Sequence, residues 1–498
     1  MIQNARIVSV FTLLSQIVAF ARTAIIASVF GVSTLIDAYN LSLVVPTLLA
    51  GVISGWMQVG FVGRYMECRR DTNEVAAVAF RTAMGGVLVA IAVASSLIML
   101  IGNEPITAML VPATSASTRV QADAALQIIA WSLVLITFSD YLGLILNCHG
   151  RFVAAAAAPI VNALVSAGLL FVWRQKTLDT LVWTLMLGWI AQLVVVALAC
   201  ARAGLWEFAW RRTAGDDVKS TLQLALPILP AVAFSNGTLV VINVFCSHLG
   251  EGAVAIYGYA SKLHGALTQV LIVGIGTVLL PHLASLLADG QREQIEQLFR
   301  RIGRATMLIA VLAVAGVIML GQPVIMVLLG RGRFDAATAA SVNSAWTILS
   351  LSLFPFALAT FFAKLFQAMR QPVLLSISAL VSLVATTVAC YFGQSFLGLR
   401  GVMLAPFVAQ VAVLVYFLAM YKKKFGDAGF LPEWARAAAL CVAMVVPSCV
   451  IDWLVRGYFD PLGREVAFGL RAVLFVGVFA VVVKLSGAFD WIARVNAS

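Results

Sequence analysis

Charge is scarce in this sequence. Asp, Glu, Lys and Arg make up only 11% of its 498 residues, whereas 62% are hydrophobic. The longest polar gap, near residues 288–304, has only about 20 residues, which is too short for a soluble domain with its own core. The composition therefore excludes a single soluble globule and a separate catalytic domain. Any activity must lie within a membrane bundle or at its face.

Cysteine and histidine are also few. The seven cysteines are scattered in or beside apolar segments, no CxxC motif occurs, and the four histidines show no metal-ligand spacing. Isolated cysteines of this kind usually pack as small apolar side chains. Zinc sites need several ligands at short, characteristic spacings. The sequence therefore predicts no metal site and no bound cofactor.

Long apolar runs are abundant instead. A membrane-spanning helix takes about 20 mostly apolar residues. The first run exceeds the apolar core of a cleavable signal peptide and contains Arg22, so we interpret it as the first span. The chain is predicted to be an all-α polytopic membrane protein with about fourteen transmembrane helices. The predicted spans are 7–30, 37–62, 83–102, 124–147, 153–173, 180–201, 220–247, 253–280, 304–325, 338–366, 373–393, 400–421, 435–455 and 466–485.

The net charge of +11 follows the predicted topology. Arginine and lysine are concentrated in the gaps after even-numbered spans, as at Arg69-Arg70, Arg211-Arg212 and Lys422 to Lys424. The gaps after odd-numbered spans contain fewer of them. The positive-inside rule therefore places the basic gaps and both termini in the cytoplasm. This distribution argues against nucleic acid as a partner.

The two halves of the chain share a weak internal repeat. The junction Asn147-Cys-His-Gly-Arg151 corresponds to Gln367-Ala-Met-Arg370, and each lies between two apolar segments. Many transporters are built from such repeats, with the substrate site between them. We predict two six-helix lobes related by a pseudo-two-fold axis, at residues 1–203 and 220–424. Residues 204–219 form a cytoplasmic linker, and 425–498 contain two additional helices.

Arg22 and Lys262 are cations inside apolar spans, one in each half of the chain. A charge at bilayer depth costs several kcal/mol, so such residues usually face a water-filled cavity and bind a ligand. Arginine can bind a phosphate through two parallel hydrogen bonds, whereas lysine acts as a point charge. We predict that Arg22 and Lys262 form an internal anion site. The alternative for each residue is a side chain that extends to the membrane interface.

Two acids accompany these cations. Asp37 opens the second span, where capping a helix N-terminus is the main alternative to a role in the cavity. Asp140 lies deep within an apolar run, so it is predicted to pair with Arg22 or Lys262, to bind a coupling cation, or to serve the structure. Uncharged polar residues in the spans line a cavity or form interhelical hydrogen bonds. They are Gln16, Asn40, Gln58, Asn162, Asn236 and Asn243.

Several motifs are distributed along almost the whole chain. They are Ser15 through Arg22, Phe30-Gly31, Asp37-Ala38, Pro46-Thr-Leu-Leu49, Ile145-Leu-Asn147, Arg151-Phe152, Ala158-Pro159, Tyr259-Ala260 with Lys262-Leu263, Gly276-Thr-Val-Leu-Leu-Pro281 and Gly332-Arg-Phe334. Together these motifs resemble the MurJ/MviN family. That family comprises the lipid II flippases within the group of multidrug, oligosaccharidyl-lipid and polysaccharide exporters.

The resemblance implies a flippase rather than an enzyme. It implies outward transport of an undecaprenyl-diphosphate-linked precursor, lipid II of peptidoglycan biosynthesis, across the bacterial inner membrane by alternating access. Arg22 and Lys262 would bind the diphosphate, while polar side chains would line the path of the sugars. The two C-terminal helices would form a groove for the lipid tail. Such a protein is expected to function as a monomer, coupled to a monovalent cation or to the membrane potential.

The chain departs from the family at the charged positions of the cavity. The family's first helix has a second arginine and an aspartate where this chain has Gln16 and Thr23. Its second helix has an arginine pair and an acid where this chain has the uncharged stretch Ala50 to Trp56. These losses favour an alternative, a flippase for a lipid-linked exopolysaccharide or O-antigen unit. A second alternative is a drug/cation antiporter of the same superfamily, although its cavity should be net acidic.

Overall fold

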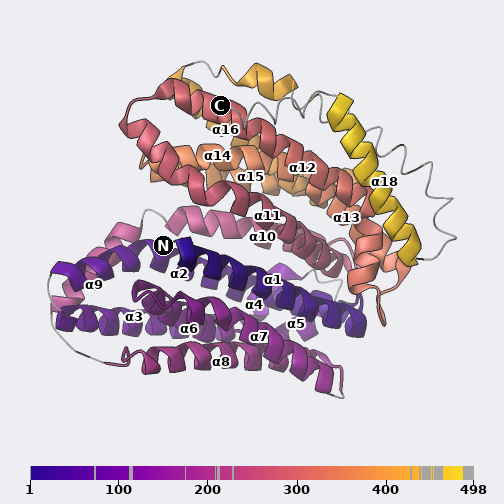
Figure 1. The fold of residues 1–498 in the computed structure, drawn as a ribbon. Coiled ribbons are helices and arrows are strands. Elements are labelled where there is room, and N and C mark those ends of the chain that lie inside the picture. The colour runs from indigo at the N-terminus through magenta and orange to yellow at the C-terminus, as the bar shows by residue number, and fades with distance from the viewer. Residues whose placement is uncertain are drawn as a thin grey trace. The chain divides into compact units, whose positions relative to one another are not determined.

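The computed structural model describes residues 2–71, 74–111, 116–173, 175–207, 209, 213–226, 229–426, 429–436, 439, 450, 453 and 464–485. The elements drawn over these ranges are helices (Figure 1). The chain divides by its contacts into two compact units. The first unit is Met1–Ala255 with Gly332–Phe334, and the second is Ile256–Arg331 with Asp335–Ser498.

The first unit is a bundle of helices around an aromatic core. Phe61 of α2 stacks on Phe80 of α3, with ring centroids 5.7 Å apart, and meets Tyr141 of α6 edge-on at 5.1 Å. Burying such large rings supplies much of the packing energy of a helical bundle. The helices are α1 (Ile2–Phe30), α2 (Thr34–Asp71), α3 (Glu74–Ile101), α4 (Asn103–Leu110), α5 (Ala116–Ile129), α6 (Ser132–Cys148), α7 (Phe152–Val172), α8 (Leu178–Arg202), α9 (Thr213–Ala225) and α10 (Leu229–Ser247).

The second unit has its own aromatic core. The ring centroids of Trp434 and Phe430 lie 4.7 Å apart. The Trp434 indole nitrogen donates to the Phe299 carbonyl oxygen at 3.2 Å. Its helices are α11 (Ala253–Ala288), α12 (Arg292–Leu329), α13 (Ala336–Ser350), α14 (Leu353–Ala368), α15 (Pro372–Leu397), α16 (Leu399–Phe425) and α18 (Arg464–Leu485). The first residues of α11 belong to the first unit by contact.

The predicted class of fold, an all-helical membrane protein, is confirmed. Within the described ranges, nine helices are long and apolar enough to cross a membrane, or ten if the bent pair α5 and α6 is one span. That pair occupies the predicted fourth span and bends by 41°. The predicted seventh span, residues 220–247, contains the end of α9 and all of α10, and residues 227 and 228 between these helices lie outside the described ranges. Most of the predicted span 435–455 lies outside the described residues.

The predicted lobe boundaries describe the sequence repeat, whereas the two units describe packing. Helix α10 packs against α2 and belongs by contact to the first unit, although the repeat assigns residues 220–424 to the second lobe. The repeat boundaries stay a prediction.

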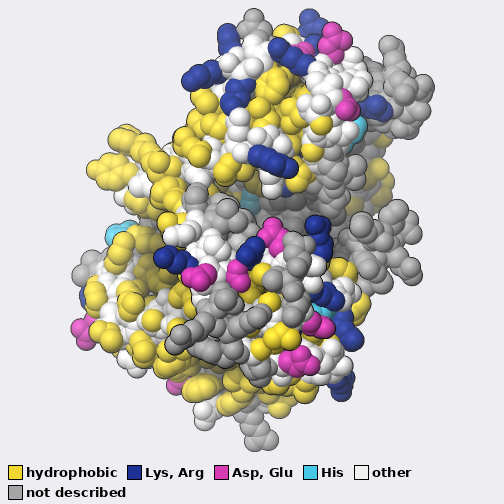
Figure 2. All heavy atoms as spheres, turned by 90° about the vertical axis from the view of Figure 1, so that its left-hand side faces the viewer, with side chains coloured by type: hydrophobic (Ala, Val, Ile, Leu, Met, Phe, Trp, Pro, Cys, Tyr) yellow, Lys and Arg dark blue, Asp and Glu magenta, His cyan; other side chains and the backbone are white. Residues whose placement is uncertain are grey.

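Basic residues gather at one end of the first unit. Helices α2, α6 and α8 end there, and α3 and α7 begin there. Arg69 donates to the Cys148 carbonyl oxygen at 3.3 Å, and Arg81 donates to that of Glu207 at 2.9 Å, so their side chains hold the neighbouring turns. Figure 2 shows Lys and Arg side chains prominent on the face that it turns to the viewer. The grouping of basic turns at one end agrees with the alternation used to predict topology.

The opposite end of the first unit contains the turn after α1 and residues 332–334. The Arg333 amide donates to the Ser28 carbonyl oxygen at 2.9 Å. Gly332 has a φ of +61°, and a Cβ there would lie 2.1 Å from the Ser28 oxygen. Only glycine fits this left-handed, crowded position. The Gly332-Arg-Phe334 motif is therefore explained by packing against the end of α1.

Candidate functional site

Arg22 is positioned by the helix that follows it. Its guanidinium on α1 donates to the Tyr39 hydroxyl on α2 at 2.8 Å. Tyr39 is 3% exposed, whereas Arg22 is only partly buried. A guanidinium has five N–H donors in a fixed plane. The Tyr39 contact therefore orients Arg22 and leaves further donors for an anion.

Lys262 lies on α11 in the second unit, and its side chain is exposed. Two residues further along the helix, the His264 ring lies 3.3 Å from the Ser352 hydroxyl of the loop before α14. This contact joins α11, the helix that contains Lys262, to the residue before α14 in the second unit. Arg22 and Lys262 belong to different units, so their predicted joint site stays a prediction.

Asp37 caps a helix other than its own. It lies in the first turn of α2, and its carboxylate accepts from the amides of Gly252 at 2.5 Å and Ala255 at 2.7 Å. These amides lie at the N-terminus of α11, where backbone N–H groups have no partner within the helix. Asp37 is 4% exposed, and both of its oxygens are used. Asp37 therefore caps the N-terminus of α11, a helix that is far from it in the sequence.

We expect Asp37→Ala to destabilise the fold, because it leaves two buried amides without an acceptor. Losses of helix caps cost up to about 2 kcal/mol. The thermal unfolding midpoint of the purified protein in detergent measures the effect. Asp37→Asn keeps one carbonyl oxygen and should lose less. Equal midpoints for Asp37→Ala and the parent protein would contradict the capping role.

Asp140 on α6 has one hydrogen-bond partner among the described residues. The Ser54 hydroxyl on α2 donates to its carboxylate at 2.5 Å. Asp140 and Arg22 form no ion pair in the described structure, so the predicted pairing of these two residues is not observed here. Asp140 is only partly buried by surface area. One carboxylate oxygen is thus held by Ser54 while the other is available to a proton or cation.

Two glycines bring α2 and α10 into close contact. A Cβ on Gly51 would lie 2.8 Å from the Asn236 amide oxygen, and one on Gly55 would lie 2.9 Å from a Val232 methyl. Two small residues four positions apart are a common signal for close packing of membrane helices. In the sequence, this stretch stands out from the resembled family by its missing charges. The Gly51 and Gly55 spacing was the signal that could have predicted the contact.

The uncharged polar candidates have different environments. The Asn162 side chain on α7 donates to Gln192 on α8 at 3.2 Å, and Gln192 donates to the Ser139 hydroxyl on α6 at 3.0 Å. All three are buried, so Asn162 joins helices within the first unit. Asn243 donates to the Leu239 carbonyl oxygen of its own helix at 2.8 Å, and Gln16 is exposed on α1. Gln192 was missed, although a glutamine within the apolar run 180–201 signals such a bond.

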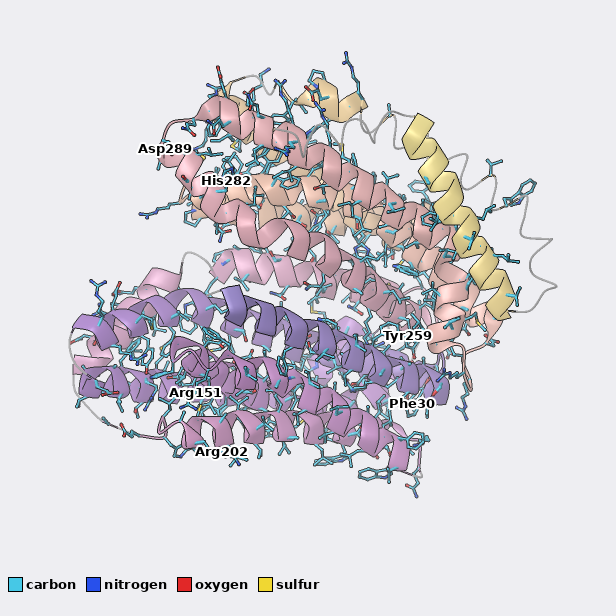
Figure 3. The ribbon with its side chains drawn as sticks, in the orientation of Figure 1. Phe30, Arg151, Arg202, Tyr259, His282 and Asp289 are labelled. Atoms are coloured by element: carbon cyan, nitrogen blue, oxygen red, sulfur yellow. The ribbon has the colours of Figure 1, made fainter. Side chains whose placement is uncertain are left out.

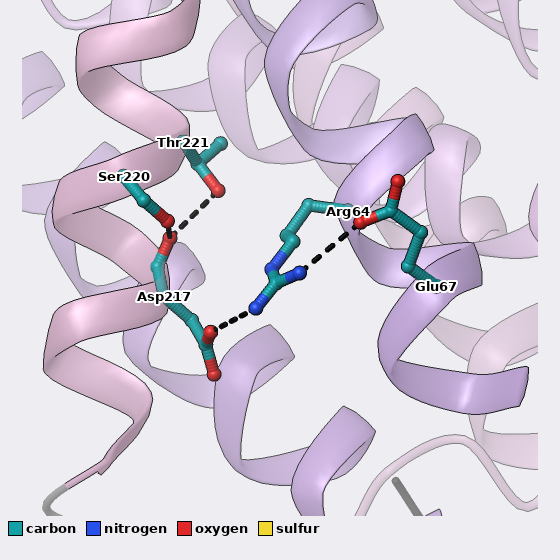
Figure 4. A network of polar contacts seen from close by, with 5 residues as sticks. All are labelled: Arg64, Glu67, Asp217, Ser220 and Thr221. Atoms are coloured by element: carbon teal, nitrogen blue, oxygen red, sulfur yellow. Dashed lines mark hydrogen bonds and ion pairs between the residues drawn. The ribbon is translucent and has the colours of Figure 1, made fainter. Parts of the chain in front are cut away.

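An ion-pair network joins α9, which begins within the predicted linker, to α2 (Figure 4). The Arg64 guanidinium donates to Asp217 on α9 at 2.6 Å and to Glu67 at 3.1 Å. The hydroxyls of Ser220 and Thr221 donate to the Asp217 carbonyl oxygen at 2.9 and 2.7 Å. Because these charges are partly exposed, the network orients α9 more than it stabilises the fold.

Known proteins match almost the whole chain. The family model described as "Lipid II flippase MurJ" matches residues 26–471. A relative from Burkholderia cenocepacia named "Lipid II flippase MurJ" is 26% identical over 497 residues, covering 95% of each chain. A "Probable lipid II flippase MurJ" from Rhizobium meliloti is also 26% identical, covering 94% of this chain and 89% of the relative.

Solved structures share the fold. A lipid II flippase MurJ in an inward closed conformation has a TM-score of 0.79 at 18% identity, covering 97% of this chain and 99% of that chain. An inward-facing MATE family multidrug transporter of the MOP superfamily has a TM-score of 0.69 at 15% identity, covering 82% and 96%.

Proposed function

Because the chain belongs to the lipid II flippase MurJ family, we propose that it moves lipid II from the inner to the outer leaflet of the bacterial cytoplasmic membrane. The family match over residues 26–471, which spans both units, carries this proposal. The activity is transport in peptidoglycan biosynthesis rather than catalysis. The partners are a lipid-linked glycan and the bilayer, and the protein works as a monomer.

Arg22 and Lys262 are the proposed diphosphate ligands. A diphosphate entering the low-dielectric interior must have its charge compensated, or desolvation prevents its entry. Arg22, oriented by Tyr39, offers several N–H donors in one plane. Lys262 contributes a point charge from α11, where its side chain is exposed. Alternating access between the lobes at 1–203 and 220–424 would expose this site to each leaflet in turn. The helices within 425–498 would hold the lipid tail.

We propose Asp140 as the coupling site for a proton or a monovalent cation. Its only hydrogen-bond partner in the described ranges is Ser54, and none of the ion pairs there includes it. A carboxylate at membrane depth without a cationic partner is costly unless it binds a proton or a cation. Loading and unloading of Asp140 would link transport to the ion gradient or to the membrane potential.

A lipid-linked exopolysaccharide or O-antigen unit is the alternative cargo. Gly51 and Gly55 lie where the family's motif has charged residues, and in this structure they pack against α10. This part of α2 therefore contributes helix packing rather than cationic contacts to a cargo. A drug/cation antiporter is a weaker alternative, because Arg22 and Lys262 make the proposed cavity cationic rather than acidic.

Complementation tests the cargo. The chain is expected to restore growth to a strain depleted of its own lipid II flippase. Membrane expression should be verified by immunoblot, and the Arg22→Ala variant provides a matched inactive control. Failure at verified expression, together with restored O-antigen display in a strain lacking its O-antigen flippase, would replace lipid II by the alternative cargo.

The topology prediction places Lys423 in the cytoplasm and Arg331 outside. On a cysteine-free background, Lys423→Cys should react with a membrane-impermeant maleimide only after the cells are permeabilised. Arg331→Cys should react in intact cells, because its turn is predicted to face outward. The side chains of Arg331 and Lys423 are both exposed, so a difference in labelling reports the side of the membrane on which each residue lies. Labelling of residue 423 in intact cells would refute a cytoplasmic location for this turn.

A further inference from the structure

A groove with two arginines lies at the basic end of the first unit. Its volume is about 440 Å³, and it is lined by Gly150 and Arg151 of the turn before α7, by the first residues of α7 (152–154), and by Ala199 and Arg202 of α8. Figure 3 labels Arg151 and Arg202, which come from different elements and lie toward the same end of the bundle, away from Phe30. Helices α6 and α8 end at this level and α7 begins there. The groove therefore lies where apolar helices meet the membrane interface.

The groove offers several donors to an anion. Arg151 and Arg202 are both exposed, and the guanidinium group of neither has a hydrogen-bond or ion-pair partner among the described residues. Arg151 is also the N-cap residue of α7, and its side chain does not cap the helix. The first amides of α7 therefore lack a side-chain acceptor at the groove. Two guanidinium groups beside such amides form a suitable environment for phosphate oxygens.

An apolar surface continues from the arginines along the helices. Val194 and Leu198 of α8 are 47% and 53% exposed, and with Arg202 they recur every fourth residue. Residues four apart form one slightly inclined row on a helix. Val153 of α7, at the groove itself, is 47% exposed. Basic groups at the interface with an apolar row leading into the membrane match an anionic headgroup with an acyl chain.

We propose that this groove binds an anionic phospholipid of the bilayer, with its phosphate between Arg151 and Arg202 and an acyl chain along α8. Basic pockets between membrane helices are known to recognise such headgroups. A bilayer phospholipid is abundant at this depth, so even a weak site would be occupied by mass action. This site uses neither Arg22 nor Lys262, and the proposal does not depend on the cargo.

Lipid-induced thermal stabilisation of the purified full-length protein in detergent tests the proposal. Dioleoylphosphatidylglycerol should raise the unfolding midpoint of the parent protein, and dioleoylphosphatidylcholine should not. The concentration of phosphatidylglycerol needed for half of the effect should rise about fivefold for each arginine replaced, in Arg151→Gln and in Arg202→Gln. The double variant should respond alike to both lipids. Arg151→Lys keeps the charge and should retain most of the response.

The matched control is Lys219→Gln. It removes one exposed positive charge from α9, outside the groove, so it should leave the response to phosphatidylglycerol unchanged. An equal loss in this variant would show non-specific attraction and overturn the site, as would an unchanged response in the double variant. Glycerol 1-phosphate, which lacks acyl chains, should not stabilise the protein at the same concentration. Stabilisation by glycerol 1-phosphate, or by undecaprenyl diphosphate but not by phosphatidylglycerol, would replace the proposed occupant.

Discussion

Arg22→Ala and Lys262→Ala are each expected to abolish nearly all transport while the protein still reaches the membrane. A hydrogen bond to a charged group contributes about 1.5–3 kcal/mol, so losing one phosphate contact weakens binding about tenfold or more. The penalty should be larger inside the membrane, because the low-dielectric surroundings make an uncompensated diphosphate charge more costly. Outward movement of a labelled precursor in proteoliposomes measures the effect directly.

Charge is the property that these variants test at Lys262. Lys262→Arg keeps the charge and restores the family's residue, so it should remain active and improve use of lipid II. Lys262→Gln keeps polarity and approximate length but loses the charge, so it should fail. Tyr39→Phe removes the hydroxyl that orients Arg22 and should lower transport less than Arg22→Ala does. Full transport by both alanine variants would refute the proposed cationic diphosphate site. The two residues would then either extend to the membrane interface or serve helix packing.

Asp140→Asn is expected to reduce transport about tenfold or more and to remove its dependence on pH or sodium. Asparagine is nearly isosteric, and its carbonyl oxygen can still accept from Ser54, so the contact between α2 and α6 should persist. The variant loses the charge that a proton or a sodium ion would neutralise. Transport in proteoliposomes at several pH values and sodium concentrations separates loss of coupling from loss of folded protein.

Asp289→Asn provides the control for this experiment. Asp289 is an exposed acid after α11 (Figure 3), so its replacement makes the same change in charge away from Ser54. It should transport as the parent protein does under every condition. A parent-like response of Asp140→Asn to pH and sodium would assign Asp140 a structural role with Ser54 only.

The helical membrane fold could be predicted because its signal is local. Each span is a continuous apolar run whose length is set by the bilayer, and its backbone groups are satisfied within the same helix. The distribution of Lys and Arg among the turns is also contained in the sequence. Breaks such as the bend between α5 and α6 were missed, because an apolar run does not show where a helix changes direction.

The site residues depended on contacts that local patterns do not contain. Asp37 is at the start of a span by sequence, yet it accepts from Gly252 and Ala255, more than two hundred residues away. Likewise, the partner of Asp140 is Ser54 rather than Arg22 in the described structure. Local spacing can identify a helix end or an intramembrane charge. It cannot identify a partner supplied by another helix.

The sequence by itself determined the membrane class, the approximate spans, the basic turns and the two intramembrane cations. These properties follow from hydrophobicity and charge along one chain, because a bilayer selects for them segment by segment. Only the tertiary structure decided that Tyr39 orients Arg22, that Gly51 and Gly55 pack against α10, and that Arg151 and Arg202 share a groove. Each of these depends on which helix faces bury one another, and packing between distant segments sets that choice.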